Sequence, residues 1–238
     1  MRGCVCADVG GWICSMSKLT AEEQLEKFKR RHDRNMRVSE AYGMLTGITA
    51  MLRPGDFVID CGANVGVVTE PLAATGATVH CFEPDPYAFG KLTKKFADTP
   101  NVTLHNAAVG VKKGTVQLMR ADNFDDNPNF GSVKSTVVSG GRSINEDTTI
   151  DVEQINFISY LQDMIDQHGE IAFLKMDIEG AELEILEEME TENLFDPIRC
   201  TVVETHERKF KALRPRFKAL KARIAKAYPM RKVNLNWI

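Results

Sequence analysis

Several features are missing from this 238-residue sequence, and each absence argues against a class of protein. No apolar run approaches the ~18 residues that a membrane-spanning helix needs, so we expect no membrane span. No C-x-x-C pair accompanies Cys4, Cys6 and Cys14, which argues against a zinc site there. A net charge of −3 gives no overall electrostatic reason to expect nucleic acid or an acidic membrane as a partner.

The first residues also lack the pattern of a secretory signal, because Asp8 and two glycines interrupt their apolar part. Translation could even begin at Met16. The cysteines Cys61, Cys81 and Cys200 fall in expected buried strands, which is typical of reduced thiols. We therefore expect a cytoplasmic protein.

The composition, 43% hydrophobic and 26% charged, is sufficient for one sizeable core. We expect a helical extension over 1–54 and a main domain over 55–238. In the extension, Thr20 and Glu23 form a capping box that starts a helix, and a second helical stretch covers 39–52.

Short apolar runs alternate with helical patterns after Gly55, which predicts an α/β fold with a mainly parallel, twisted sheet and helices on both faces. The predicted strands cover 56–60, 78–84, 102–109, 171–177 and 200–205, and the predicted helices between them cover 66–75, 85–98, 155–168 and 180–191. Residues 111–150 interrupt this rhythm and predict an inserted hairpin, with strands at 114–120 and 135–140 around a mobile loop.

A small-residue turn follows the first strand, at the sheet edge where such folds bind ligands. It reads Gly62, Ala63, Asn64, Val65, Gly66, and so lacks the central glycine of the dinucleotide fingerprint G-x-G-x-x-G. Asp60 would also repel phosphate and instead suits a ligand with a cation, such as the amino group of an amino acid. A nicotinamide-dependent oxidoreductase is therefore a rival that this turn disfavours.

The ends of the next two strands suit a nucleoside. Glu83, followed by Pro84, lies where an acidic residue accepts hydrogen bonds from ribose hydroxyls in nucleotide-binding α/β folds. Asn106, Ala107 and Ala108 follow the third strand and offer an amide and two small residues, which suit a flat ring such as adenine.

Four motifs in order, "DCGANVG", "FEPDP", "NAAVG" and "FLKMDIEGAELEIL", resemble the FkbM family of S-adenosylmethionine-dependent methyltransferases over roughly 55–206. The resemblance implies a Rossmann-like class I methyltransferase fold. It implies that the methionine part of the cofactor is bound by Asp60, Gly62, Asn64 and Gly66, its ribose by Glu83, and its adenine by Asn106 with Ala107. We count Ala63 and Pro84, which lie within the same motifs, with the cofactor-binding residues.

The fourth motif and the strand after it supply the catalytic candidates Asp177, Glu179 and His206. Asp177 ends a strand beside the expected methyl group, and Glu179 either acts with it or caps the next helix. His206 is a possible general base, because an ordinary histidine is neutral at physiological pH. With Glu204, these residues could alternatively hold a divalent metal, which we do not favour. For Glu182 and the other acids of the helix we expect a solvated face.

The C-terminal region 206–232 is strongly basic. We expect mainly a solvated helix face, or else a docking surface for an acidic acceptor such as a glycan or a phosphorylated sugar. Nucleic acid is less expected, because interleaved aromatic residues are missing. One terminal strand, 232–238, follows, and it either invites a homodimer or packs its Trp237 into the chain's own core.

These observations predict methyl transfer from S-adenosylmethionine, most simply to a hydroxyl group of a small molecule or saccharide, with the inserted hairpin over the acceptor pocket. The alternative to an enzyme is a protein that binds the cofactor, RNA or another partner without methyl transfer.

Overall fold

The computed structural model describes residues 20–122, 124–126 and 128–237. The expectations for Cys4, Cys6, Cys14 and Met16 lie outside these residues. Within the described ranges, no helix combines the length and apolar character that crossing a membrane requires.

A six-stranded, wholly parallel sheet forms the centre of the domain, with strand order β3-β2-β1-β7-β8-β9. Its strands are β1 (Phe57–Cys61), β2 (Thr78–Phe82), β3 (Val102–His105), β7 (Phe173–Met176), β8 (Thr201–Val203) and β9 (Val233–Asn234). The strand order reverses between β1 and β7, and the carboxyl ends of these two strands therefore mark the expected ligand site. The predicted α/β, Rossmann-like architecture is confirmed.

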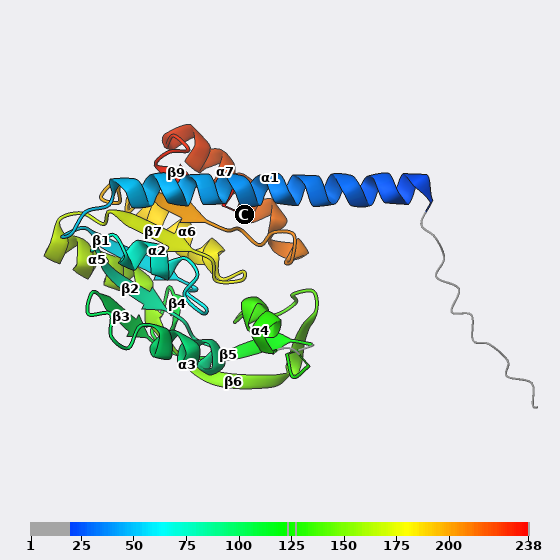
Figure 1. Ribbon diagram of the computed structural model, residues 1–238, viewed down its shortest axis with the longest axis horizontal. Helices are drawn as coiled ribbons and strands as arrows, with labels where there is room; N and C mark the ends of the chain where they lie inside the picture. The colour runs from blue at the N-terminus through cyan, green and yellow to red at the C-terminus, as the bar shows by residue number, and fades with distance from the viewer. Residues whose placement is uncertain (1–19, 123, 127, 238) are drawn as a thin grey trace, which may run out of the picture.

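Helices cover both faces of this sheet (Figure 1). One face packs against α1 (Ala21–Met51), α2 (Thr69–Ala73) and α3 (Pro86–Lys95), and the other against α5 (Phe157–His168), α6 (Glu182–Thr191) and α7 (Arg214–Ala227). Because side chains alternate along a strand, Val58 joins the first of these cores while Phe57 and Ile59 join the second.

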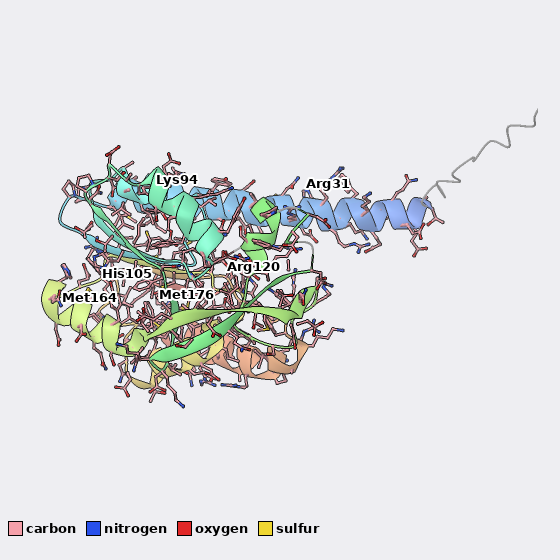
Figure 2. All side chains as sticks on the ribbon, turned by 90° about the horizontal axis from the view of Figure 1, so that it is seen from below. Arg31, Lys94, His105, Arg120, Met164 and Met176 are labelled. Carbon is pink, nitrogen blue, oxygen red and sulfur yellow. The ribbon has the colours of Figure 1, made fainter. Side chains whose placement is uncertain are left out.

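The N-terminal extension forms one continuous helix, α1, and the prediction of two helices was wrong. The predicted capping box is present, since Thr20 and Glu23 each accept a hydrogen bond from the other's backbone N–H. Gly43 and Gly47 do not interrupt the helix, which packs onto the domain around Leu45. Its first half, which carries Arg31, projects beyond the domain (Figures 1 and 2).

The insertion forms a second, three-stranded sheet of order β4-β6-β5. It contains β4 (Ala108–Gly110), β5 (Gly114–Ala121), α4 (Pro128–Gly131), the 3-10 helix η1 (Ser132–Lys134) and β6 (Ile144–Asn156). The predicted strand at 114–120 is present as β5, but it pairs antiparallel with β6 and not with the segment 135–140. The predicted strand at 135–140 was wrong: β6 occupies the long edge of β5, and Thr136 retains only an isolated bridge to Met119.

Two further boundaries differ from expectation. The predicted strand 102–109 divides into β3 and β4, which belong to different sheets. The predicted helix 66–75 shortens to α2, because Gly66 adopts a φ of 80° before it.

After α7, which follows the 3-10 helix η2 (Lys211–Leu213), β9 pairs with β8 of the same chain and Trp237 is buried. Packing into its own core therefore accounts for the terminal strand.

Replacing Phe217 with Ala would remove a fully buried ring between α7 and the sheet. We expect the free energy of unfolding, measured with urea, to fall by about 3–5 kcal/mol. Phe28→Ala is the matched control, because that ring is 56% exposed on α1, and its effect should stay below about 0.5 kcal/mol. Equal losses in the two variants would contradict this packing of α7.

Candidate functional site

The glycine turn after β1 lies against the end of β7. Gly62 and Gly66 have φ values of 76° and 80°, and Asn64 has a φ of 47°. A Cβ atom on Gly62 would lie 1.7 Å from the carbonyl oxygen of Asp177, so only glycine allows this close approach. The N–H groups of Gly62 and Ala63 donate to the carbonyl of Phe82, which ties the same turn to β2.

A buried ion pair lies beneath this turn. Asp60 approaches Lys175 Nζ at 3.2 Å, and its other oxygen accepts a hydrogen bond from Thr69. Lys175 Nζ also donates to the carbonyl oxygens of Cys61 and Gly62. Burial lowers the pKa of Lys175, but the charge of Asp60, then that of Asp177, outweighs this effect and raises it well above its ordinary value.

Glu83 presents a buried carboxylate at the end of β2. Its oxygens accept hydrogen bonds from the backbone N–H groups of Asn64 and Asp85, each at 2.8 Å. Burial raises the pKa of Glu83 to about 7, although these two hydrogen bonds act in the opposite direction. The carboxylate is therefore held rigidly and is close to its titration point at neutral pH.

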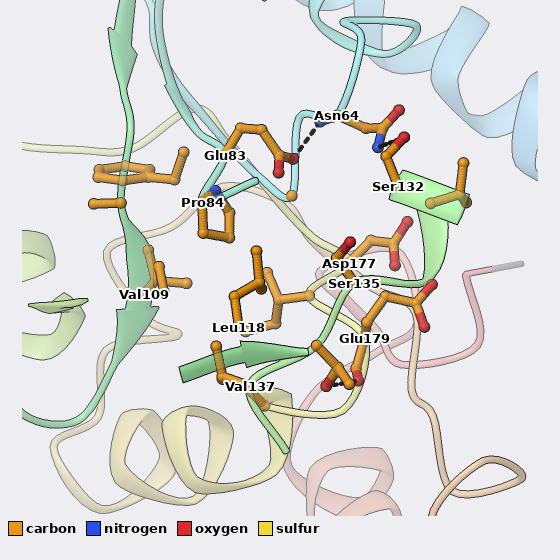
Figure 3. A pocket seen from close by; sticks show the side chains of 18 residues that line it. Asn64, Glu83, Pro84, Val109, Leu118, Ser132, Ser135, Val137, Asp177 and Glu179 are labelled. Carbon is orange, nitrogen blue, oxygen red and sulfur yellow. Dashed lines mark hydrogen bonds between the residues drawn. The ribbon is translucent and has the colours of Figure 1, made fainter. Parts of the chain in front are cut away.

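A pocket opens between the ends of β1, β2 and β7 and the insertion (Figure 3). One side is polar, with Glu83, Asn64 and Asp177, whereas the other is apolar around Leu118 and Val109. Among the predicted cofactor-binding residues, the pocket is lined by Gly62, Asn64, Glu83, Pro84 and Ala107. This combination of carboxylate acceptors and an apolar wall suits a nucleoside.

The other predicted cofactor-binding residues do not line the pocket. Asp60 lies beneath it, as described above, and Ala63 is buried in the adjoining core. Gly66 packs against the Phe96 ring, where a Cβ atom would lie 2.5 Å away. The side-chain amide of Asn106 donates to the backbone carbonyls of Glu83 and Pro84 and so shapes the turn instead.

The insertion supplies pocket residues that the sequence patterns did not reveal, among them Leu118, Ser132 and Val137. It is attached to the sheet through Asp85, which accepts two hydrogen bonds from Arg120 and one from Ser135. Asp85 also caps α3. The position of an acidic residue before Pro86 indicates such a cap, but only the fold shows that Arg120 meets it.

The strained turn after β7 carries the catalytic candidates. Glu179 has a φ of 57° and Gly180 a φ of 118°, both uncommon for an ordinary side chain. Glu182 holds this turn, because its Oε1 accepts hydrogen bonds from the N–H groups of Ile178 and Gly180. The same oxygen lies 2.9 Å from Nδ1 of His206.

The expectation of a solvated Glu182 was therefore wrong, since this side chain is fully buried. The position of Glu182 in the sequence already indicated that it is buried. Glu182 precedes Ile185, Leu186 and Met189 by three, four and seven residues, and these three residues form the buried stripe of α6. Charge alone suggested exposure, whereas position on the helix placed Glu182 inside.

The predicted catalytic residues Asp177 and Glu179 lie around Nε2 of His206, together with Glu204. Its Nε2 lies 3.5 Å from Glu179, 3.7 Å from Asp177 and 3.9 Å from Glu204. Burial lowers the pKa of His206, but hydrogen bonding to Glu179 and Glu182, together with their charges, raises it to about 11. These surroundings favour a protonated imidazole at neutral pH.

The carboxylates around His206 have shifted pKa values of their own. Burial raises the pKa of Asp177, although Lys175 and His206 oppose the shift. Burial, with repulsion from Asp177, raises the pKa of Glu204 to about 8. The pKa of Glu179 is lowered: burial raises it, but His206 and Lys209 outweigh that effect. A carboxylate with a raised pKa is the kind of group that accepts a proton near neutral pH.

The same cluster is the candidate for a metal. Asp177, Glu182 and His206 each offer one ligand atom within 4.8 Å of the others. Oε1 of Glu182 already accepts two backbone hydrogen bonds, and Lys209 neutralises Glu179 at 2.7 Å. These contacts fit a hydrogen-bonded proton-transfer cluster better than an open coordination site.

The chain matches known proteins over most of this architecture. The family model described as Methyltransferase FkbM domain matches residues 60–227. The 31-O-demethyl-FK506 methyltransferase FkbM of Streptomyces tacrolimicus is 29% identical over 184 residues, 66% of this chain and 67% of that protein. Methyltransferase sdnD of Sordaria araneosa is 28% identical over 199 residues, 72% of this chain and 73% of that protein.

The raised pKa of His206 has a consequence for stability. A histidine whose folded pKa exceeds its ordinary value of 6.5 stabilises the folded state fully below that pH, and this contribution is lost as the pH rises through the folded pKa. The stability advantage of wild type over His206→Gln should therefore shrink between pH 6.5 and 9, by at most about 1.4 kcal/mol per pH unit.

Urea unfolding at several pH values measures this difference. His32→Gln is the matched control, because His32 is exposed on α1. Its difference from wild type should stay constant over the same range. A constant difference for His206→Gln as well would contradict the proposed protonation.

Proposed function

Because this chain belongs to the FkbM family of methyltransferases, we propose that it transfers a methyl group from S-adenosylmethionine to a hydroxyl oxygen of a small molecule or saccharide. One observation carries the proposal. A pocket with a polar side and an apolar side, at the reversal of strand order, opens directly beside a buried cluster of carboxylates around His206.

The pocket residues fit the cofactor. Glu83 would accept hydrogen bonds from the ribose hydroxyls, and Ala107 with the apolar wall would enclose the adenine. Gly62 and Asn64 would border the methionine part, because both line the pocket and Gly62 has no side chain that could fill it. The contacts of Asp60 favour an indirect role, in which it fixes Lys175 and through it the carbonyl of Gly62.

S-adenosylmethionine supplies, when bound, a methyl group on a cationic sulfur, and the carbon–sulfur bond breaks as a carbon–oxygen bond forms. The protein has to align the acceptor oxygen with that methyl group and to accept the hydroxyl proton. Asp177 lines the cofactor pocket and has a raised pKa, so we assign it the proton. The buried Glu182 orients His206, whose positive charge opposes the effect of burial and favours the ionised form of Asp177.

The name of one relative supports a hydroxyl acceptor. The Streptomyces tacrolimicus protein is called a 31-O-demethyl-FK506 methyltransferase, which describes transfer to oxygen on a small molecule. The cluster around Asp177 would serve such an acceptor, because a hydroxyl group has to lose its proton.

We also propose a cytoplasmic location. Cys61, Cys81 and Cys200 are free thiols, and burial raises the pKa of each. Unpaired thiols of this kind are common in reducing compartments.

Calorimetric titration with S-adenosylmethionine tests the cofactor assignment. Glu83→Ala removes the carboxylate that would accept the ribose hydroxyls, so the affinity should fall at least about tenfold. Glu188→Gln removes an exposed acid on α6 and should bind as wild type does. A folded wild-type protein that binds no S-adenosylmethionine would end the proposal.

Asp177→Asn tests the proton acceptor. The variant should keep most of its cofactor affinity, while methyl transfer falls about 100- to 10,000-fold because the amide cannot take up the hydroxyl proton. Transfer of a radiolabelled methyl group into pools of hydroxyl-bearing metabolites and saccharides measures this loss, with Glu188→Gln again as the control. Undiminished transfer would exclude the role of Asp177. Loss of transfer with a chelator and recovery with Mg²⁺ would instead assign the cluster to a metal.

A further inference from the structure

A second hollow lies beside the catalytic cluster. It shares Glu179 with the cofactor pocket, and Glu204 and His206 also line it. An acceptor that enters this hollow therefore reaches the carboxylates around His206 next to the cofactor pocket.

The rest of its wall is strongly basic. Four cations converge from segments far apart in the sequence: Arg37 on α1, Lys134 at the end of η1, Arg142 in the loop before β6 and Arg208 after β8. We call this surface the basic hollow. Within the described residues, none of the four makes an ion pair with a carboxylate.

Several neighbouring cations do have a carboxylate partner. On α7, Arg216 pairs with Glu187 and Arg223 with Glu190. Lys209 and Lys221, which also line the hollow, pair with Glu179 and Glu207. Like charges that gather without partners repel one another, and a bound anion would remove that repulsion.

The chemistry of the four cations suits a tetrahedral oxyanion. Three of them are arginines, whose planar guanidinium groups donate paired hydrogen bonds to phosphate or sulfate oxygens. The two kinds of charge in the lining would orient a ligand, because the carboxylates Glu179 and Glu204 repel an anion while the four cations attract it. An anionic acceptor would thus place its hydroxyl end toward Glu179.

We propose that the basic hollow binds a phosphate or sulfate group of the acceptor, so that the substrate is an anionic hydroxyl compound such as a phosphorylated saccharide. This inference rests on the proposed methyl transfer and names the substrate class of the same site. RNA fits less well, because Trp237, the aromatic residue in the described lining, is buried and offers no face for base stacking.

Calorimetric titrations with inorganic phosphate, inorganic sulfate, glucose 6-phosphate and glucose test the proposal. Wild type should bind glucose 6-phosphate and leave glucose unbound. The double variant Arg142→Gln/Arg208→Gln should weaken binding of glucose 6-phosphate at least about tenfold. The matched double variant Lys94→Gln/Lys218→Gln removes two exposed charges outside the hollow, one on α3 (Lys94, labelled in Figure 2) and one on α7. This variant should bind as wild type does.

A separate titration with S-adenosylmethionine keeps the two proposals distinguishable. All variants should bind the cofactor equally, and a wild type without cofactor binding would overturn the methyl-transfer proposal alone. The inference is overturned if wild type binds no anionic probe, or if both double variants bind it equally well. It is also overturned if the binding of a single-stranded RNA depends on Arg142 and Arg208 while the binding of the small anions does not. The phosphate and sulfate titrations decide which oxyanion the hollow prefers.

Discussion

The buried contact between Lys175 and Asp60 joins the two halves of the sheet, and the functional site depends on it. It links β7 to β1 where the strand order reverses, and Lys175 also donates to the carbonyl of Gly62. Removing one partner of such a pair leaves an uncompensated buried charge, which typically costs about 3–5 kcal/mol. This ion pair thus helps to hold the glycine turn against the end of β7, where Gly62 and Asp177 line the same pocket.

The insertion turns this open sheet edge into a pocket. Without it, the ends of β1 and β2 would face solvent, and the apolar wall around Leu118 would be missing. Arg120 makes the attachment specific, because its guanidinium binds both oxygens of Asp85 and lies over the ring of Phe124 at 3.9 Å. The segment that interrupts the strand–helix alternation therefore forms part of the pocket wall, and it also carries Lys134 and Arg142 of the basic hollow.

The charges around His206 affect both pockets, because the two pockets share Glu179. Four carboxylates surround His206, and each would repel the others if the imidazole were neutral. A protonated His206 compensates part of this charge, which is why the proposed function assigns the acceptor's proton to a carboxylate and not to the histidine. The ordinary pKa of histidine suggested the opposite assignment, because it takes no account of burial among acidic neighbours.

Three features were determined by the sequence alone. The alternation of apolar runs determined the fold class, the capping box at Thr20 determined the start of α1, and the glycine turn determined the sheet edge that holds the pocket. These features depend on local backbone preferences and burial. Only the tertiary structure decided which side chains meet. It buried Glu182 beside His206, turned Asn106 toward the backbone and replaced the expected strand at 135–140 with β6 as the partner of β5. Such contacts join residues distant in the chain, and their energies depend on desolvation and on neighbouring charges that no local pattern contains.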